Sequence, residues 1–190
     1  MNPDPSENNP WITRNTELVY ESPWIKVFRN EVINPAGNPA IYSVVHFQNY
    51  AIGILAINCI GEISLVGQYR YPIEAYAWEI PEGGGKLGED PLENAKRELK
   101  EETGIQAHSI SEFMRLHLSN SATDELAIVY LATKLQHGTA SPEESEVLNS
   151  KMIHIEEAFK MIMNGEITDA ISVAAIQKAY WLFKNDSLSF

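Results

Sequence analysis

The chain has 190 residues, which is enough for one domain with a sizeable core and a small additional element. Its net charge of −12 makes most of the surface repel polyanions, which argues against nucleic acid as a partner. No basic and apolar leader opens the chain, and its apolar runs are too short to span a bilayer. The one cysteine, Cys59, cannot form an internal disulfide and is expected to be buried. These features predict a cytoplasmic protein with no membrane partner.

The N-terminal quarter of the chain predicts a small sheet behind a loose end. Residues 1–16 are rich in Pro and Asn, which is typical of a flexible terminus. Residues 17–48 are predicted to form an antiparallel sheet with strands over 17–20, 25–33 and 41–47. These strands have more apolar positions than a lone three-stranded sheet can bury, so we expect a second surface to cover them.

Residues 49–190 predict one further domain with its own core. Core strands are expected over 51–58, 63–70 and 76–81, followed by a helix and by strands over 113–119, 126–135 and 151–155. Two helices close the chain, one over about 156–164 and one that begins near Thr168 or Asp169. This order predicts an α+β sandwich in which helices cover the sheet faces.

The most informative stretch is residues 83–105, GGGKLGEDPLENAKRELKEETGI. Asp90 as the N-cap and Pro91 at the first helical position predict where its helix begins. Glu93 stands where a capping box would place an acid that reaches back to the N-cap. Gly104 supplies the left-handed residue that ends the helix.

Acidic side chains crowd one face of this helix. Glu98 and Glu102 are four residues apart and share a face, Glu101 adjoins it, and Arg97 lies within ion-pair reach of Glu101. Such carboxylates repel one another, and a hard cation such as Mg²⁺ relieves that repulsion. A solvated acidic face is the ordinary interpretation of such a run, but it does not require the glycines that precede the helix at residues 83–85.

The spacing of these residues carries a family resemblance. From Gly83 to Ile105 the pattern is G, five residues, E, seven residues, R-E, an apolar residue, any residue, E-E, any residue, G and an apolar residue. It resembles the motif of the Nudix hydrolases without a gap. Residues 68–71, 78–81 and 155–170 further resemble the ADP-ribose and nucleotide-sugar pyrophosphatase branch. The resemblance implies a Nudix-type α/β/α sandwich with a mixed core sheet, and hydrolysis of a nucleoside diphosphate sugar to a nucleoside monophosphate and a sugar phosphate.

The resemblance also implies roles for the motif residues. Mg²⁺ or Mn²⁺ is expected to be held by Glu98 and Glu102, while Glu101 contributes a ligand or orients a water molecule. The backbone carbonyl of Glu82 commonly completes such a site. Arg97 is expected to pair with the motif carboxylates and to hold them in place.

The general base is expected outside the helix. In this branch a glutamate in the loop before the last strand often has this role, and Glu144 and Glu146 are the candidates here. An acidic loop is otherwise simply solvated. Glu101 is the alternative base if neither loop residue serves.

Substrate contacts are expected before the helix. The guanidinium of Arg70 is suited to bind a diphosphate, although an arginine at a strand end is as often only a surface residue. Gly83 and Gly84 let the backbone approach a ligand. Members that prefer ADP-ribose often have a Pro-Gly loop about fifteen residues after the motif, whereas residues 118–125 read LSNSATDE. ADP-ribose, GDP-mannose, other nucleotide sugars and dinucleotides therefore all stay open.

Two further expectations concern partners and rival functions. Related pyrophosphatases pair their N-terminal segments, which implies a homodimer through the strands of residues 17–48. A non-catalytic nucleotide-sensing module on the same fold generally lacks motif glutamates, and none is missing here. A Nudix hydrolase of another substrate, such as a dinucleotide polyphosphate, an oxidised nucleotide or capped RNA, is the remaining alternative.

Overall fold

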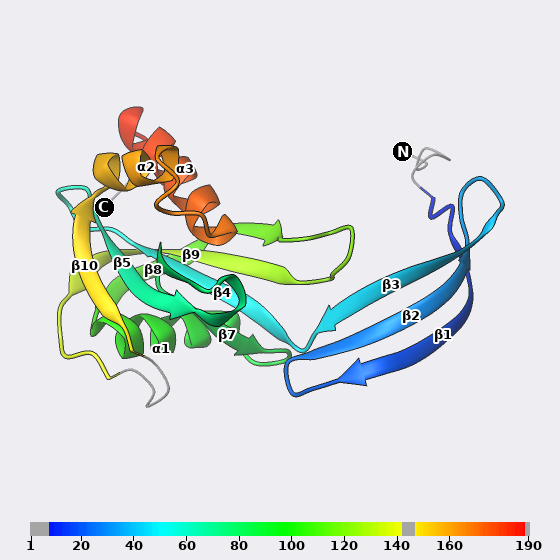
Figure 1. Ribbon diagram of the computed structural model, residues 1–190. Helices are drawn as coiled ribbons and strands as arrows, with labels where there is room; N and C mark the ends of the chain where they lie inside the picture. Colours follow the sequence, from blue (N-terminus) through cyan, green and yellow to red (C-terminus); the bar gives the residue numbers. More distant parts are fainter. Residues whose placement is uncertain (1–7, 142–146, 189–190) are drawn as a thin grey trace. The chain divides into compact units, whose positions relative to one another are not determined.

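The structure is a computed structural model that describes residues 8–141 and 147–188. The chain forms two compact units (Figure 1). The first extends to Gln48 and includes Ser119–Glu125, and the second comprises Asn49–Leu118 and the chain from Leu126 onward. No helix in the described ranges is long and apolar enough to cross a membrane.

The first unit contains a three-stranded antiparallel sheet in the order β1-β2-β3. Its strands are β1 (Ile12–Glu21), β2 (Ile25–Ile33) and β3 (Pro39–Phe47). β1 begins at Ile12 rather than at residue 17, so part of the segment expected to be flexible is strand. The physical reason is pairing, because Ile12 lies opposite Ile33 and Thr13 opposite Val32 in the register with β2.

The first unit also takes in a segment distant in sequence, Ser119–Glu125. Asp124 accepts a hydrogen bond from the backbone N–H of Phe47 at 2.9 Å, and its other carboxylate oxygen lies 2.6 Å from Nδ1 of His46. Thr123 forms a parallel bridge with Val45 of β3. This association was not predicted, because nothing in the local pattern of residues 119–125 indicates which strand they contact.

The second unit contains two sheets. A four-stranded mixed sheet has the order β7-β4-β9-β8, and a three-stranded antiparallel sheet has the order β10-β5-β6. β4 runs parallel to β9, and the other pairs are antiparallel. The bounds are β4 (Asn49–Ala56), β5 (Glu62–Arg70), β6 (Ala75–Glu79), β7 (Glu82–Lys86), β8 (Gln106–His117), β9 (Leu126–Gln136) and β10 (Asn149–His154).

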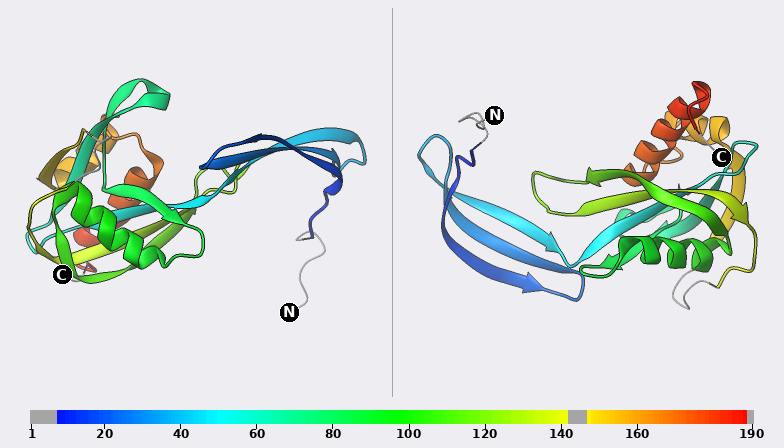
Figure 2. Two further views of the ribbon diagram at one scale, coloured as in Figure 1. Left: turned by 90° about the horizontal axis from the view of Figure 1, so that it is seen from below. Right: turned by 180° about the vertical axis from the view of Figure 1, so that it is seen from behind.

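Three helices flank these sheets: α1 (Pro91–Thr103), α2 (Ile155–Met163) and α3 (Ala170–Lys184). Within this unit α1 lies on one side, and α2 and α3 lie on the other (Figures 1 and 2). Successive residues of β4 point to opposite faces, so Ile54 packs with Leu99 of α1, whereas Leu55 packs with Ile176 of α3. Both faces of β4 are covered, which explains its continuous apolar run. The predicted α/β/α sandwich with a mixed sheet is confirmed.

The glycines before α1 belong to β7, because Gly83 pairs with Ile52 of β4. Two local predictions differ from the structure. β8 begins at Gln106 rather than at residue 113, because Gln106 already lies opposite Gln136 of β9. The expectation that Cys59 is buried is wrong, since it lies exposed in the turn after β4.

Candidate functional site

The start of α1 places the motif glutamates. The side chain of Asp90 accepts a hydrogen bond from the N–H of Leu92 at 3.0 Å, and Pro91 occupies the first turn, as predicted. The predicted capping box is wrong, because the carboxylate of Glu93 is bound to Lys96 at 2.6 Å. The helix therefore begins after the N-cap Asp90 without a capping box.

The end of α1 is fixed at Gly104, whose φ of +73° is the predicted left-handed conformation. A β-carbon at Gly104 would lie 2.6 Å from the carbonyl oxygen of Gly138, so the chain after β9 passes close by. The N–H of Ser141 donates to the carbonyl of Glu101 at 2.9 Å. The loop that carries the proposed base therefore starts at the end of α1, while Glu144 and Glu146 themselves lie outside the described residues.

Two motif carboxylates converge on one short piece of backbone. A β-carbon at Gly83 would lie 2.1 Å from the carboxyl carbon of Glu98, so any other residue there would displace this carboxylate from its present position. The adjacent N–H of Glu82 donates to Oε2 of Glu102 at 3.0 Å. Both carboxylates are shielded, with 13% of the Glu98 side chain and 3% of Glu102 exposed. Residues far apart in the motif thus meet where β7 begins.

Arg97 binds two motif carboxylates at once. Its Nη2 lies 2.6 Å from Glu98 and its Nη1 lies 2.8 Å from Glu101. The predicted pair with Glu101 is confirmed, and the pair with Glu98 adds to it. Burial alone would lower the pKa of Arg97, but the charges of Glu98 and Glu101 outweigh this effect and raise it. In this structure Glu101 is held by Arg97 beside the pair of Glu98 and Glu102.

The carboxyl group of Glu82 belongs to an acidic cluster that was not predicted. Burial raises the pKa of Glu82 well above its usual range, and the charge and hydrogen bond of Asp169 and the charge of Glu79 raise it further. The hydroxyl of Ser172 donates to Oε1 of Glu82 at 3.1 Å, which lowers this pKa in part. In the sequence, Asp169 and Ser172 show only the spacing of an N-cap.

Arg70 lies beside this cluster. Its Nε donates to both carboxylate oxygens of Glu79 at 3.0 Å, its Nη2 also binds Glu79, and these contacts raise its pKa. Arg70 also lines a cavity of about 330 Å³ together with Ile73 and Asp169. In the described part of the chain, Arg70 forms hydrogen bonds and an ion pair with Glu79 alone. The binding of a diphosphate by Arg70 stays a prediction.

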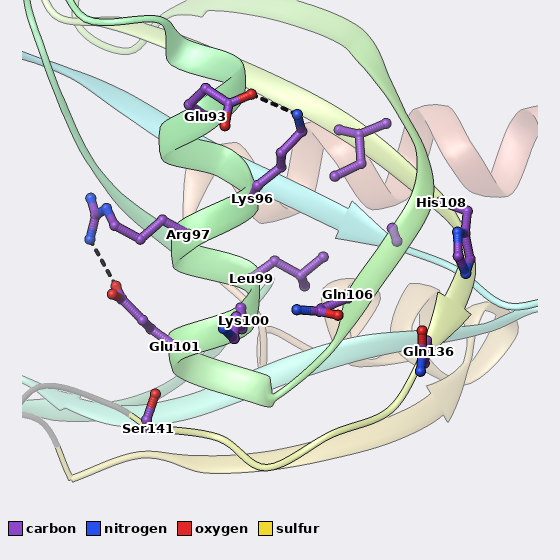
Figure 3. A pocket seen from close by; sticks show the side chains of 12 residues that line it. Glu93, Lys96, Arg97, Leu99, Lys100, Glu101, Gln106, His108, Gln136 and Ser141 are labelled. Atoms are coloured by element: carbon purple, nitrogen blue, oxygen red, sulfur yellow. Dashed lines mark hydrogen bonds and ion pairs between the residues drawn. The ribbon is translucent and has the colours of Figure 1, made fainter.

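A separate pocket of about 540 Å³ lies along α1 (Figure 3). Lys96, Lys100 and Glu101 of α1 line it, together with Gln106 and His108 of β8. Glu98 and Glu102 do not line it. It is therefore distinct from the place where the two carboxylates converge.

The carboxylates of Glu98 and Glu102, which meet beside the backbone of Glu82 and Gly83, are oxygen ligands of the kind that bind divalent metal ions. No group of three or more His, Cys, Asp and Glu side chains that could hold a metal occurs in residues 8–141 and 147–188. The predicted donors are the side chains of Glu98 and Glu102, the backbone carbonyl of Glu82 and Glu101, which was expected to contribute a ligand or to orient a water molecule. Here the carboxylate of Glu101 is held by Arg97 at 2.8 Å. Carboxylate and carbonyl oxygens are the ligands that hard divalent cations take. The approach of both carboxylates to Glu82 and Gly83 fits such a set.

Comparisons with known proteins agree with this geometry. Residues 48–174 match the model of the NUDIX domain, and residues 10–45 match that of the nucleoside diphosphate sugar hydrolase N-terminal domain. The ADP-ribose pyrophosphatase of Bacillus subtilis (strain 168) is 31% identical over 163 residues, which are 85% of this chain and 88% of that protein. The methanol dehydrogenase activator of Bacillus methanolicus is 30% identical over 167 residues, covering 87% of this chain and 90% of its own.

A solved structure described as an ADP compounds hydrolase superposes with a TM-score of 0.82 and covers 94% of this chain and 97% of its own. At 22% identity it shows the shared fold. Nudix hydrolases generally require a divalent metal ion, which agrees with the carboxylates that converge at β7. The motif at its full spacing and the match over residues 48–174 show that this chain belongs to the Nudix hydrolase family.

Proposed function

We propose that the protein hydrolyses a nucleoside diphosphate sugar to a nucleoside monophosphate and a sugar phosphate, with Mg²⁺ or Mn²⁺ as its cofactor. One observation carries the proposal: Glu98 and Glu102 converge on the backbone of Glu82 and Gly83. The substrate class is supported by the match of residues 10–45 to a nucleoside diphosphate sugar hydrolase domain and by the name of the Bacillus subtilis relative.

The reaction adds water across a phosphorus anhydride. The oxygen of water bonds to one phosphorus, the bridging P–O bond breaks, and the leaving phosphate keeps the bridging oxygen. A bound divalent cation would acidify water and neutralise the charge that develops on phosphate. Glu98, Glu102 and the carbonyl of Glu82 would hold this cation, and Arg97 restrains Glu98 through their 2.6 Å ion pair. Glu101 is restrained by the same guanidinium.

Proton acceptance is assigned to the loop after β9. The motif carboxylates that bind a cation are poor proton acceptors, so Glu144 or Glu146 is proposed as the general base. The contact of Ser141 with Glu101 supports this assignment, because it starts that loop at the end of α1. Glu101 is the alternative base.

Substrate binding is assigned to residues near β7. Arg70 would donate from Nη1 to a phosphate oxygen while Glu79 holds the other side of its guanidinium. The backbone at Gly83 and Gly84 would lie against the diphosphate. ADP-ribose is the first substrate to test, given the relative's name. GDP-mannose and other nucleotide sugars follow, because residues 118–125 contain no proline.

The first unit is proposed to form a homodimer. Val32 is the one buried apolar side chain in the described part of this unit. Many large apolar side chains are exposed there, namely Trp11, Ile12, Leu18, Val19, Tyr20, Trp24 and Ile41. An exposed apolar surface of this kind is typical of an interaction site. A cytoplasmic location, suggested by the single cysteine, is part of the same proposal.

An activity screen tests the proposed function. Purified protein with Mg²⁺ would be incubated with ADP-ribose, GDP-mannose, UDP-glucose, diadenosine polyphosphates and NADH, and nucleoside monophosphate would be measured. We expect release from at least one nucleotide sugar, and loss of release in Glu102→Gln. Hydrolysis of the dinucleotides alone would assign another Nudix substrate. Binding of these compounds without turnover would indicate a sensing module instead.

A further inference from the structure

Ser172 lies in the first turn of α3, and its side chain is fully buried against the segment that leads into β7. Its hydroxyl oxygen accepts a hydrogen bond from the backbone N–H of Ile80 at 2.9 Å. The same hydroxyl donates to Oε1 of Glu82 at 3.1 Å. A hydroxyl has a single proton, so its acceptor role toward Ile80 leaves that proton for Glu82. One side chain therefore binds both ends of the segment 80–82.

Ser172 is itself held in a fixed place. Its backbone N–H donates to Oδ2 of Asp169, the N-cap of α3, at 2.7 Å. The preceding residue, Ile171, is buried, and a β-carbon at Gly53 of β4 would lie 2.8 Å from its Cγ2. The start of α3 is thus seated closely against β4. The hydroxyl of Ser172 is therefore buried, and the packing of α3 fixes its position relative to β4.

The segment 80–82 connects this point to the motif carboxylates. Its middle residue, Pro81, accepts a hydrogen bond from the N–H of Ile54 at 2.9 Å. Its last residue, Glu82, donates its N–H to Oε2 of Glu102 at 3.0 Å. A continuous path therefore runs from the hydroxyl of Ser172 through Glu82 to the carboxylate of Glu102. The path consists of two hydrogen bonds joined by the covalent bonds of Glu82 between its carboxyl group and its N–H, and all of its residues belong to the second unit.

We propose that Ser172 is a positioning residue of the metal site. It sets the backbone of residues 80–82 so that the carboxylate of Glu102 and the carbonyl of Glu82 keep the spacing that a divalent cation requires. This inference rests on the proposed metal-dependent hydrolysis. Groups that orient metal ligands typically change metal affinity or activity by 10–100-fold when they are removed.

Loss of the hydroxyl has a defined consequence. In Ser172→Ala the N–H of Ile80 loses its acceptor and the carboxyl of Glu82 loses a donor, both inside the protein. The carboxyl of Glu82 keeps its hydrogen bond with Asp169, but a buried N–H of Ile80 without a partner is unfavourable, so the segment would shift toward other partners. A shift of Glu82 would move the N–H that now binds Glu102. Affinity for the metal ion is therefore expected to fall even in the absence of substrate.

The test measures binding of Mn²⁺ to the substrate-free protein by electron paramagnetic resonance of free Mn²⁺. The variants are Ser172→Ala, Ser172→Thr, which keeps a hydroxyl, and Ile176→Val, a fully buried position of the same helix whose apolar side chain cannot form a hydrogen bond with residues 80–82. We expect the Kd for Mn²⁺ to rise by about 10–100-fold in Ser172→Ala. It should stay close to the wild-type value in Ser172→Thr and in Ile176→Val, although the latter loses a methylene group from the core.

Two results would overturn the inference. One is a folded Ser172→Ala variant with wild-type affinity for Mn²⁺. The other is a loss of affinity in Ile176→Val as large as that in Ser172→Ala, because affinity would then follow stability alone. If circular dichroism shows that Ser172→Ala is unfolded, Ser172→Cys takes its place, because a thiol has a similar size but forms weak hydrogen bonds. Wild-type affinity in Ser172→Cys would equally overturn the inference.

Measurements on the wild-type protein distinguish a failure of the proposed function from a failure of the proposed role of Ser172. If wild-type protein neither binds Mn²⁺ nor releases nucleoside monophosphate from any nucleotide sugar, the proposed function is refuted. If it does both and Ser172→Ala is unaffected, only the role of Ser172 is refuted. Measurement of kcat and KM adds a second readout, since a positioning role should lower kcat at fixed Mg²⁺ more than it raises KM.

Discussion

The carboxyl carbon of Glu98 lies 2.1 Å from the point that a β-carbon on Gly83 would occupy. A side chain at residue 83 would force this carboxylate to move, so the first glycine of the motif permits the position of a motif glutamate fifteen residues later. Gly84, the next residue, has no atom within 4 Å of its virtual β-carbon. The two adjacent glycines are thus under different steric constraints.

This difference gives a matched pair of variants. Gly83→Ala should displace the carboxylate of Glu98, so we expect weaker binding of Mn²⁺ and a fall in kcat of at least about 10-fold. Gly84→Ala should leave both the Kd for Mn²⁺ and the melting temperature unchanged. Titration of Mn²⁺ and thermal unfolding by circular dichroism check both. Equal Mn²⁺ affinity in the two variants would show that Glu98 does not need its present position.

The paired carboxylates can be tested directly. Glu98→Gln and Glu102→Gln remove a charge while keeping shape and one acceptor oxygen, so kcat should fall by at least about 10–100-fold. The melting temperature should change little, because Gln at 102 can still accept from the N–H of Glu82. Glu93→Gln is the control on the same helix, since the surface pair of Glu93 and Lys96 contributes little. A Glu102→Gln enzyme with wild-type turnover would remove Glu102 from the ligand set.

The general base remains a prediction from the sequence. Glu144→Gln or Glu146→Gln should lower kcat by roughly 10²-fold, the usual scale for loss of a general base, with little change in KM. Raising the pH should restore part of the rate, because hydroxide replaces the missing base. Pre-steady-state or initial-rate measurements across pH would show this rescue. Full kcat in both single variants and in the double variant would make Glu101 the leading candidate.

The proposed homodimer predicts a mass in solution near twice the 21.3 kDa of one chain. Leu18→Glu places a charge on the exposed apolar surface of β1, where 47% of Leu18 is exposed, and should yield monomers. Glu17→Gln on the same strand should not change the mass, because its nearest ion-pair contact, to Arg29, is long at 4.0 Å. Light scattering at micromolar concentration measures the mass. A wild-type protein that is monomeric under these conditions would contradict the proposal.

Asp124 predicts a small pH dependence of stability. Burial by itself would raise the pKa of Asp124, but the N–H of Phe47 and the ring of His46 outweigh this effect and lower it below 3.8. Its contribution to stability is therefore present above the unfolded value and is lost as the pH falls through the folded value. Because the side chain is half exposed, Asp124→Asn should lower the free energy of unfolding by about 1 kcal/mol or less at neutral pH. Urea unfolding should show a larger difference near pH 7 than near pH 3; the same difference at both would contradict it.

The pattern of residues 83–105 was sufficient to predict the local geometry of the site. The N-cap at Asp90 follows from its side-chain acceptor and the left-handed Gly104 from its missing β-carbon, whereas the ion pair of Arg97 with Glu101 follows from the 3.6-residue period of a helix. Distances along one helix are set by backbone geometry alone. For that reason, no knowledge of the rest of the chain was needed to predict them.

Other features needed the tertiary structure. The hydroxyl of Ser172 reaches Glu82 across 90 residues, and Asp124 reaches Phe47 across 77. In the sequence Ser172 is a polar residue near the start of a largely apolar helix, and nothing there indicates which strand that helix covers. β1 extends to Ile12 because Ile12 and Thr13 pair with Ile33 and Val32 of β2.

The sequence by itself therefore determined the family motif, the face shared by Glu98 and Glu102, and the continuous apolar run of β4, which is buried on both faces. The tertiary structure decided that both carboxylates meet the backbone at Glu82 and Gly83. The physical reason is that helical and strand periods act over a few residues, whereas this meeting depends on how β7 and α1 pack against the same strand.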